Sequence, residues 1–287
     1  MITVADSGST KTSWLFYDDG NGSKYKYDSA GLNPYYQTSE SIKSKVKHEL
    51  LPLLNFSVDE VKSIHLYVAG CELPSKQRQV LIGIQKLFPS SKIQVYHDLL
   101  AAGRALFGNS AGIACISGTG SNSCFYDGLR IVHNVESLGL SLGDEGSGGY
   151  KGKLLIRDYI RGDMPGHIRN AFEQKYTDRN TEIMDAVYCK GFPSRYLASY
   201  TVFMKDHISD PYIQALLYQS YAEMFQNCIS RYKNFREAPI GFIGSVAYHF
   251  QDVLKEVASV HRVEISRIIK NPLDELSTYH LQELRVE

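Results

Sequence analysis

Residues 5–13 of this chain read Ala-Asp-Ser-Gly-Ser-Thr-Lys-Thr-Ser, and they lie between two apolar runs, Ile2–Val4 and Trp14–Tyr17. Two β-prone runs joined by small residues around a glycine are typical of a β-hairpin. The backbone N–H groups of such a turn can bind a phosphate, and Asp6 at the end of the entering strand can hold a hydrated Mg²⁺. Polar turns of this kind are common after strands, so the stretch by itself favours an ordinary turn over a phosphate site.

Residues 117–123, Ser-Gly-Thr-Gly-Ser-Asn-Ser, repeat the pattern after another apolar run, Gly112–Ile116. An ungapped comparison finds three identical pairs: Ser7 with Ser117, Gly8 with Gly118 and Ser13 with Ser123. This self-similarity predicts two related halves, each opening with a strand–turn–strand that can hold one end of a polyphosphate. Ile116 stands where the first copy has Asp6, so only the first turn offers a metal-binding carboxylate.

The composition is that of an ordinary globular protein. A length of 287 residues is long for one core and natural for two domains. The formal net charge is zero, so nothing favours a nucleic acid or a membrane surface as partner. No apolar run reaches the length of a transmembrane helix, and no secretory signal is recognisable. The five cysteines are scattered without a CxxC pair, which disfavours a disulfide framework or a zinc site. We therefore expect a soluble cytoplasmic protein.

The predicted elements follow the same order in both halves. In the first half we expect a three-stranded meander over 2–28, helix 39–54, strand 64–68, helix 74–88, strand 92–96 and helix 98–107. In the second half we expect strands 112–117, 122–126 and 129–135, a long helical region over 146–235, strand 239–243, helix 247–258, strand 260–265 and helix 273–285. This order predicts an α/β fold with a mixed sheet in each half. A break in composition at 107–110 marks the boundary between the halves.

Asp98 follows the predicted strand 92–96 and opens the next helix. An aspartate at this position commonly caps the helix. In open α/β sheets, however, ligands bind beyond the carboxyl ends of the strands, and a carboxylate there can accept the proton of an attacking hydroxyl. The neighbouring residues alone favour the cap.

Residues 139–149 contain five glycines in eleven positions, around the adjacent carboxylates Asp144 and Glu145. Either carboxylate could cap the helix that follows. The glycines exceed what a cap needs, and they suit close approach of the backbone to a ligand whose hydroxyl groups the carboxylates would bind. Capping and binding stand here as equal alternatives.

Gly244 and Ser245 end the predicted strand 239–243 ahead of another helix. The pair is either one more connection between strand and helix, or a place where glycine lets a nucleobase or ribose lie against the backbone.

Three common nucleotide and metal motifs are absent from the sequence. Residues 148–153 resemble the end of a P-loop, but Ser147 replaces its first glycine and Leu154 its final Ser or Thr. No GxGxxG follows a strand, which disfavours a dinucleotide-binding fold. The nine histidines show no HExxH-type metal spacing.

Taken together, the turns at 5–13 and 117–123, Gly-Asp-Glu-Gly-Ser at 143–147 and Gly-Ser-Val at 244–246 resemble the acetate/sugar kinase, Hsp70 and actin superfamily. Within it, the chain is similar to the N-acetylglucosamine kinases and the wider BadF/BadG/BcrA/BcrD-type ATPase family. The resemblance covers nearly the whole chain, with the motifs in the same order. It implies two ribonuclease-H-like (actin-like ATPase) domains with ATP and sugar in the cleft between them. The first would comprise residues 1–107, with the C-terminal helix 273–287 packing back on it. The second would comprise residues 108–272, and residues near 272 would act as a hinge.

The resemblance also implies a role for each motif. Asp98 would be the general base that takes the proton from the 6-hydroxyl of the sugar, and Asp6 would bind Mg²⁺. The phosphate loops and the adenosine site would consist of Gly8, Ser9, Thr10, Lys11, Thr12, Gly118, Thr119, Gly120, Gly244 and Ser245. The sugar would contact Asn33, Ser121, Asn122, Asp144 and Glu145. The expected protein is an ATP-dependent kinase for N-acetylglucosamine or a related amino sugar, and a homodimer.

Two stretches depart from the family pattern. An aromatic, glycine-rich stretch often precedes Gly-Asp-Glu-Gly-Ser, but residues 137–142 here read Ser-Leu-Gly-Leu-Ser-Leu, and Asn33 is followed by Pro-Tyr-Tyr. Both differences bear on which sugar is bound, and they leave the expected nucleotide chemistry unchanged. No cysteine cluster suits the iron–sulfur branch of the family.

Two other functional classes are alternatives on the same fold. One is an ATPase switch that acts on a partner protein, and the other is a non-catalytic regulator that binds nucleotide or sugar. The kinase is favoured over the regulator because Asp6 and Asp98 are both present and no helix-turn-helix precedes the first strand.

Overall fold

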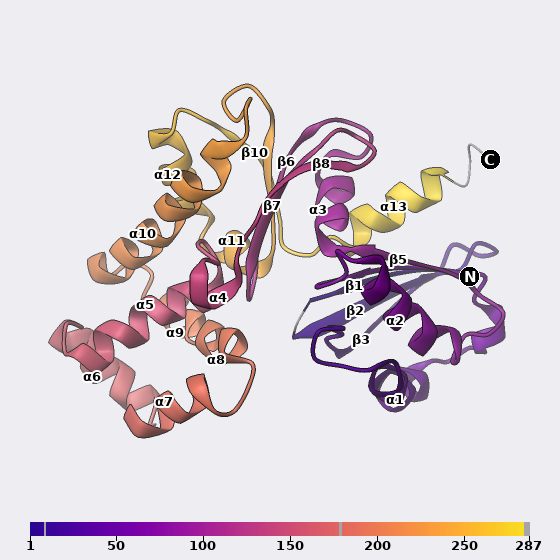
Figure 1. Cartoon of the computed structure of the whole chain (residues 1–287), viewed down its shortest axis with the longest axis horizontal. Coiled ribbons are helices and arrows are strands. Elements are labelled where there is room, and N and C mark those ends of the chain that lie inside the picture. The colour runs from indigo at the N-terminus through magenta and orange to yellow at the C-terminus, as the bar shows by residue number, and fades with distance from the viewer. Residues whose placement is uncertain (9, 178–179, 284–287) are drawn as a thin grey trace. The chain divides into compact units, whose positions relative to one another are not determined.

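The computed structural model describes residues 1–8, 10–177 and 180–283, which form two compact units (Figure 1). The first unit comprises Met1–Ser110, Gly128–Ile131 and Asn271–Glu287, and the second comprises Ala111–Asp127 and Val132–Lys270. Each unit is built around one five-stranded sheet.

The sheet of the first unit combines a meander with two parallel strands. It contains β1 (Ile2–Ser7), β2 (Lys11–Tyr17), β3 (Lys24–Ala30), β4 (Ser63–Val68) and β5 (Lys92–His97), in the order β3-β2-β1-β4-β5. The first three strands pair antiparallel, and β1–β4 and β4–β5 pair parallel. The predicted hairpin at residues 5–13 is therefore confirmed, with Asp6 paired opposite Ser13.

The helices of the first unit cover both faces of this sheet (Figure 1). They are α1 (Ser39–Glu49), α2 (Pro74–Gln85), α3 (Asp98–Phe107) and α13 (Leu273–Glu283), with 3-10 turns at Leu51–Leu53 and Val58–Glu60. On one face, α1 and α2 bury Ile42 and Ile84 against Trp14 and Phe16 of β2 in a continuous apolar core. On the other face, α13 packs against α3, β1 and β2. Helix α1 ends earlier than predicted because Pro52 cannot continue it and a 3-10 turn forms instead.

The sheet of the second unit has the same strand order as the first. It contains β6 (Gly112–Ser117), β7 (Ser121–Tyr126), β8 (Ile131–Val135), β9 (Ile240–Ile243) and β10 (Ile265–Ile269), in the order β10-β9-β6-β7-β8. Strands β6 and β7 pair antiparallel, while β6–β9 and β9–β10 pair parallel. Each unit thus has a meander followed by two parallel strands, and the predicted class, α/β with two ribonuclease-H-like domains, is confirmed.

Most helices of the second unit lie between β8 and β9 in the sequence. They are α4 (Gly139–Leu142), α5 (Gly148–Arg161), α6 (Gly166–Lys175), α7 (Asn180–Tyr188), α8 (Pro193–Ser199), α9 (Thr201–Asp206) and α10 (Pro211–Asn227), followed by a 3-10 turn at Ile229–Arg231. Two further helices, α11 (Ser245–His249) and α12 (Gln251–Val260), connect β9 to β10. Within the described ranges, no helix combines the length and apolarity needed to cross a bilayer.

The prediction of a strand at 260–265 in the second unit is wrong. Helix α12 runs to Val260, because Val253, Leu254 and Val257 form a helical stripe that is buried in the core. Val260 is exposed, and the strand begins only at Ile265, where it pairs with Ile240 of β9.

Candidate active site

Three parallel strands of the first unit end level with one another. Ser7 of β1 is in register with Val68 of β4, and Val68 is in register with His97 of β5. Asp6 lies one residue before the end of β1, and Asp98 follows β5 directly. Both carboxylates are therefore at the carboxyl edge of the sheet, where α/β proteins bind their ligands.

The carboxylates of Asp6 and Asp98 lie close enough to influence each other electrostatically. The pKa of Asp6 is raised to about 7, mainly by burial and further by the charge of Asp98. Asp98 is the first residue of α3, and the cap position belongs to His97, whose side chain makes no capping bond. The N-cap role that the local sequence favoured for Asp98 is thus wrong. Its carboxylate instead lies at the positive end of the helix, partly accessible to solvent.

His97 connects Asp98 to a third carboxylate. Its Nε2 atom lies 2.8 Å from Asp98 Oδ1 and 3.0 Å from Glu72 Oε1, although neither contact has hydrogen-bond geometry. Burial alone would lower the pKa of His97, but the contacts with Asp98 and Glu72 together raise it to about 10. Near neutral pH the ring is therefore a cation between two carboxylates. Sequence reasoning assigned no role to His97, although it directly precedes Asp98, and it missed Glu72, which the fold brings to His97 from a distant part of the chain.

The first turn is held by hydroxyl groups at its base. Ser7 Oγ and Thr12 Oγ1 share a hydrogen bond of 2.6 Å, and Ser7 Oγ also accepts from the Leu32 backbone N–H at 2.9 Å. The Gly8 N–H donates to the Lys11 carbonyl at 3.0 Å. Thr12 is fully buried, so its hydroxyl supports the turn, whereas Gly8, Thr10 and Lys11 are exposed.

Asn33 and Ser9 of the first unit are also predicted to contact the substrates. Asn33 forms a local turn in which its Oδ1 accepts from the Tyr35 backbone N–H at 3.0 Å. This places Asn33 against Gly70, the glycine that follows β4 with a φ of +77°. Ser9 lies outside the described residues.

The second turn packs against the N-terminus of α5. The carbonyls of Gly118 and Thr119 accept from the backbone N–H groups of Gly148 and Gly149, at 2.8 and 3.0 Å. A Cβ atom added to Gly148 or Gly149 would lie 3.2 Å from the carbonyl oxygen to which that glycine donates. Two of the five glycines singled out in the sequence therefore permit this contact between turn and helix.

Asp144 fixes the other side of the second turn. Its Oδ1 accepts from the Ser121 backbone N–H at 2.9 Å, and its side chain is buried. Burial raises the pKa of Asp144 to about 6, with the Ser121 hydrogen bond acting against it and Glu145 acting with it. The cap of α5 is Ser147, whose hydroxyl accepts from the Tyr150 N–H. The capping alternative for Asp144 and Glu145 is therefore wrong.

Gly146, at the centre of this loop, is anchored from several directions. Its carbonyl accepts from Ser117 Oγ at 2.7 Å and from Lys151 Nζ at 2.6 Å, and its N–H donates to Ser220 Oγ. Lys151 is fully buried above the Tyr221 ring, and burial holds its pKa well below the usual value. This buried lysine thus supports the loop from beneath.

Neighbouring side chains orient Asn122 and Glu145. Asn122 Oδ1 accepts from Asn134 Nδ2 at 3.0 Å, and Glu145 Oε1 accepts from Asn227 Nδ2 at 2.8 Å. Sequence reasoning did not single out either of these two asparagines, because each is far from its partner along the chain.

Gly244 joins the end of β9 to the ends of both neighbouring strands. Its N–H donates to the carbonyl of Ile269 at 2.9 Å, and its φ is +129°. A Cβ atom at this position would lie 2.1 Å from the Ser117 carbonyl oxygen, which is a severe overlap. Ser245 is the first residue of α11, which Gly244 precedes. The late Gly-Ser pair and the second turn are thus neighbours at one edge of the second sheet.

Comparison with known proteins identifies the family. No protein-family model and no curated protein matches the chain. A solved structure from Porphyromonas gingivalis, provisionally named an N-acetylglucosamine kinase, is 36% identical, with a TM-score of 0.94 over 99% of this chain and 100% of that one. The chain belongs to this N-acetylglucosamine kinase family. The resemblance inferred from the sequence motifs is therefore confirmed.

More distant structures share the fold of this N-acetylglucosamine kinase family member. A Chromobacterium violaceum protein with the same provisional name is 16% identical, with a TM-score of 0.72 and 98% of each chain covered. A ROK-family transcriptional regulator, a homologue of the E. coli MLC protein, is 9% identical, with a TM-score of 0.58 over 93% of this chain and 74% of that one. At these identities the likeness concerns the fold alone.

Proposed function

We propose that this protein is an ATP-dependent kinase that phosphorylates the 6-hydroxyl of N-acetylglucosamine or a related amino sugar. Family membership over the full chain supports the class of reaction. The observation that carries the proposal is the position of Asp98, a partly accessible carboxylate at the carboxyl edge of the first sheet, beside Asp6. A kinase of this class needs such a base next to the site of the metal and the phosphates.

Asp98 is proposed as the general base. The 6-hydroxyl oxygen of the sugar attacks the γ-phosphorus of ATP, the bond from that phosphorus to the bridging oxygen breaks, and ADP leaves with the bonding electrons. The hydroxyl proton passes to Asp98. A positioned base of this kind contributes about 10²–10⁴ in rate. His97 is proposed as a positioning residue, because its contact with Oδ1 restrains one carboxylate oxygen and leaves Oδ2 for the sugar.

Asp6 is proposed as the protein's contribution to a Mg²⁺ site. A carboxyl whose pKa is raised by burial and by a second carboxylate gains from a bound cation. Mg²⁺ commonly keeps several waters and takes one or two carboxylates together with substrate phosphates, so one protein carboxylate can be enough to hold it. The ion would neutralise charge on those phosphates.

The remaining predicted residues are proposed to bind the two substrates. Phosphates would contact the exposed residues of the first turn and the second turn at Gly118–Gly120. Adenosine would contact Gly244 and Ser245, and the sugar would contact Asn33, Ser121, Asn122, Asp144 and Glu145. The support for these sugar contacts is that Asn122, Asp144 and Glu145 are each held in one orientation by a hydrogen bond.

An ADP-release assay with a panel of amino sugars tests the proposal. Release that depends on N-acetylglucosamine or a related amino sugar is the expected result. Release without sugar would instead indicate an ATPase switch, and ligand binding without release would indicate a regulator. Asp98→Asn should retain the fold and ATP binding while losing about 10²-fold or more of the sugar-dependent rate. A variant that turns over at the wild-type rate would disprove the role of Asp98.

We also propose that the active form is a homodimer in the cytoplasm. Sedimentation velocity of the purified chain tests the dimer, and a single species at 32.3 kDa would contradict it.

A further inference from the structure

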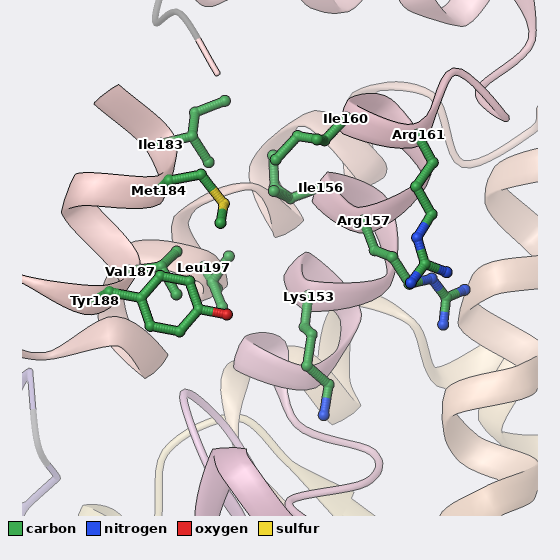
Figure 2. A pocket seen from close by; sticks show the side chains of 10 residues that line it. All are labelled: Lys153, Ile156, Arg157, Ile160, Arg161, Ile183, Met184, Val187, Tyr188 and Leu197. Carbon is green, nitrogen blue, oxygen red and sulfur yellow. The ribbon is translucent and has the colours of Figure 1, made fainter. Parts of the chain in front are cut away.

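A cavity of about 320 Å³ lies among the helices of the second unit, bordered by α5, α7 and α8 (Figure 2). Its volume is at the lower end of those that hold small organic ligands. The residues proposed to bind phosphates and sugar do not line it. The cavity therefore has no function in the proposed reaction.

Most of the residues that line the cavity are apolar or aromatic. Ile156 and Ile160 of α5 face Ile183 and Val187 of α7 across it (Figure 2). Met184 of α7 also lines the cavity and is 45% exposed. A ligand that covers this exposed apolar surface removes it from water, which makes binding more favourable.

The α5 border of the cavity also carries three cations. Lys153, Arg157 and Arg161 are spaced four residues apart, so they form one row on α5 beside the row of isoleucines. The ten described lining residues include these three cations and no carboxylate. Arg157 Nε contacts Asp158 Oδ1 at 3.1 Å, outside the lining, and Lys153 Nζ donates to the Leu140 carbonyl. Arg157 is thus paired with Asp158, and Lys153 is also attracted by Glu145 and Glu223. Among the described residues Arg161 makes no ion pair, so a bound anion would gain most from the Arg161 end of the row.

We propose that this cavity binds a small amphipathic anion, a molecule with one carboxylate or phosphate head and an apolar body. The head would lie at the row of Lys153, Arg157 and Arg161, where guanidinium groups can bind it with two hydrogen bonds each. The body would lie against the isoleucines and Met184. Charge complementarity selects this class over neutral or cationic amphiphiles, and the proposal does not depend on the kinase activity.

Calorimetric titration of the full-length protein with octanoate and octyl phosphate tests the proposal, with octanol and octyltrimethylammonium as matched probes. Both anions should bind at least tenfold more tightly than either matched probe. The stronger of the two identifies the head group as a carboxylate or a phosphate. Equal binding of octanol and the anions would overturn the proposal, since the cavity would then be only an apolar hollow.

Variants at exposed positions test the placement of the ligand. Arg157→Gln combined with Arg161→Gln should weaken anion binding at least tenfold, which corresponds to about 1.4 kcal/mol. Met184→Glu should also weaken it and Met184→Lys should strengthen it, while circular dichroism confirms that each variant is folded. Arg78→Gln, at an exposed arginine of α2 in the other unit, is the matched control and should bind as the wild type does. Unchanged binding in the double variant, or an equal loss in the control, would overturn the proposal.

Discussion

His97 Nε2 lies 2.8 Å from Asp98 Oδ1 at the carboxyl edge of the first sheet. The same nitrogen lies 3.0 Å from Glu72 Oε1, and the two carboxylates raise the pKa of the ring to about 10 despite its burial. A charged imidazole in this position restrains the carboxylate that we propose as the base. It also couples the stability of the site to pH.

Replacement of His97 by glutamine should lower kcat about tenfold or more and leave the KM for ATP unchanged. A glutamine side chain can still donate a hydrogen bond, but it carries no charge to hold both Asp98 and Glu72. Steady-state kinetics at pH 7.5 provide the measurement. Equal losses in kcat and in ATP affinity would argue against a positioning role.

The same variant should change how stability depends on pH. Because the folded-state pKa of His97 is raised above the ordinary value of 6.5, its stabilising effect is fully present below pH 6.5 and is lost as pH rises towards about 10. The difference in unfolding free energy between wild type and His97→Gln should therefore be largest at pH 6 and should shrink by pH 10. Urea denaturation measures it, with His48→Gln at an exposed helix position as control. A difference that stays constant with pH would contradict the charged state of His97.

Asp6→Asn should remove the response of the protein to Mg²⁺. The pKa of Asp6 is raised to about 7, so the ionised carboxyl costs folding free energy that grows as pH rises from about 4 to about 7. A bound cation offsets that cost, and Mg²⁺ should raise Tm more at pH 8 than at pH 6. In the absence of metal at pH 8, the asparagine variant should be the more stable protein. An identical Mg²⁺ shift in both proteins, measured by thermal unfolding, would exclude Asp6 as the metal ligand.

The repeated turns allowed the fold to be predicted, because a hairpin is encoded by neighbouring residues. The Ser-Gly turns at 5–13 and 117–123 anticipated two sheets with the same strand order. The position of β10, the last strand of the second sheet, could not be predicted in this way. Val260 has the β-branched side chain of a strand residue, but α12 is stabilised by packing on the core and continues through it. A strand such as β10 exists only where a partner, here β9, supplies its hydrogen bonds.

The chemistry of the site was only partly predictable. Asp98 was singled out because it follows a strand end, where α/β proteins bind ligands, and Asp144 because it lies among five glycines. Their proposed roles came from the family resemblance. Their partners were not identified, since Asp144 accepts from Ser121, which lies 23 residues away, and Glu72 reaches His97 from a separate loop. Local patterns name candidate residues, whereas orientation depends on contacts between distant segments.

Asp144→Asn should separate the structural from the binding role of this residue. Asparagine retains an oxygen that can accept from the Ser121 N–H, and it tolerates the left-handed backbone at φ +67°. The unfolding free energy should therefore change by less than about 1 kcal/mol, while Asp144→Ala should lose about 1–3 kcal/mol. If the carboxylate binds a sugar hydroxyl, the KM for sugar should rise about tenfold in the asparagine variant. Asp163→Asn, at an exposed position in the same unit, is the control. A variant with wild-type KM would leave Asp144 a structural role only.

Gly244→Ala should disrupt the second turn as well as its own loop. The new Cβ would lie 2.1 Å from the Ser117 carbonyl oxygen, so the end of β6 and the turn at Gly118 would have to move. The matched control is Gly162→Ala, since Gly162 also has a positive φ, +86°, but open space around its Cβ position. The control should lose only the cost of the left-handed backbone, about 1–2 kcal/mol, while Gly244→Ala should lose about 1–3 kcal/mol more.

Nucleotide binding distinguishes the two glycines further. Because the Gly244 overlap displaces the proposed phosphate turn, ATP affinity should fall at least tenfold in Gly244→Ala and stay unchanged in Gly162→Ala. Isothermal titration with a non-hydrolysable ATP analogue measures both. Loss of stability in Gly244→Ala with wild-type affinity for the analogue would show that Gly244 supports the sheet edge without shaping a nucleotide site.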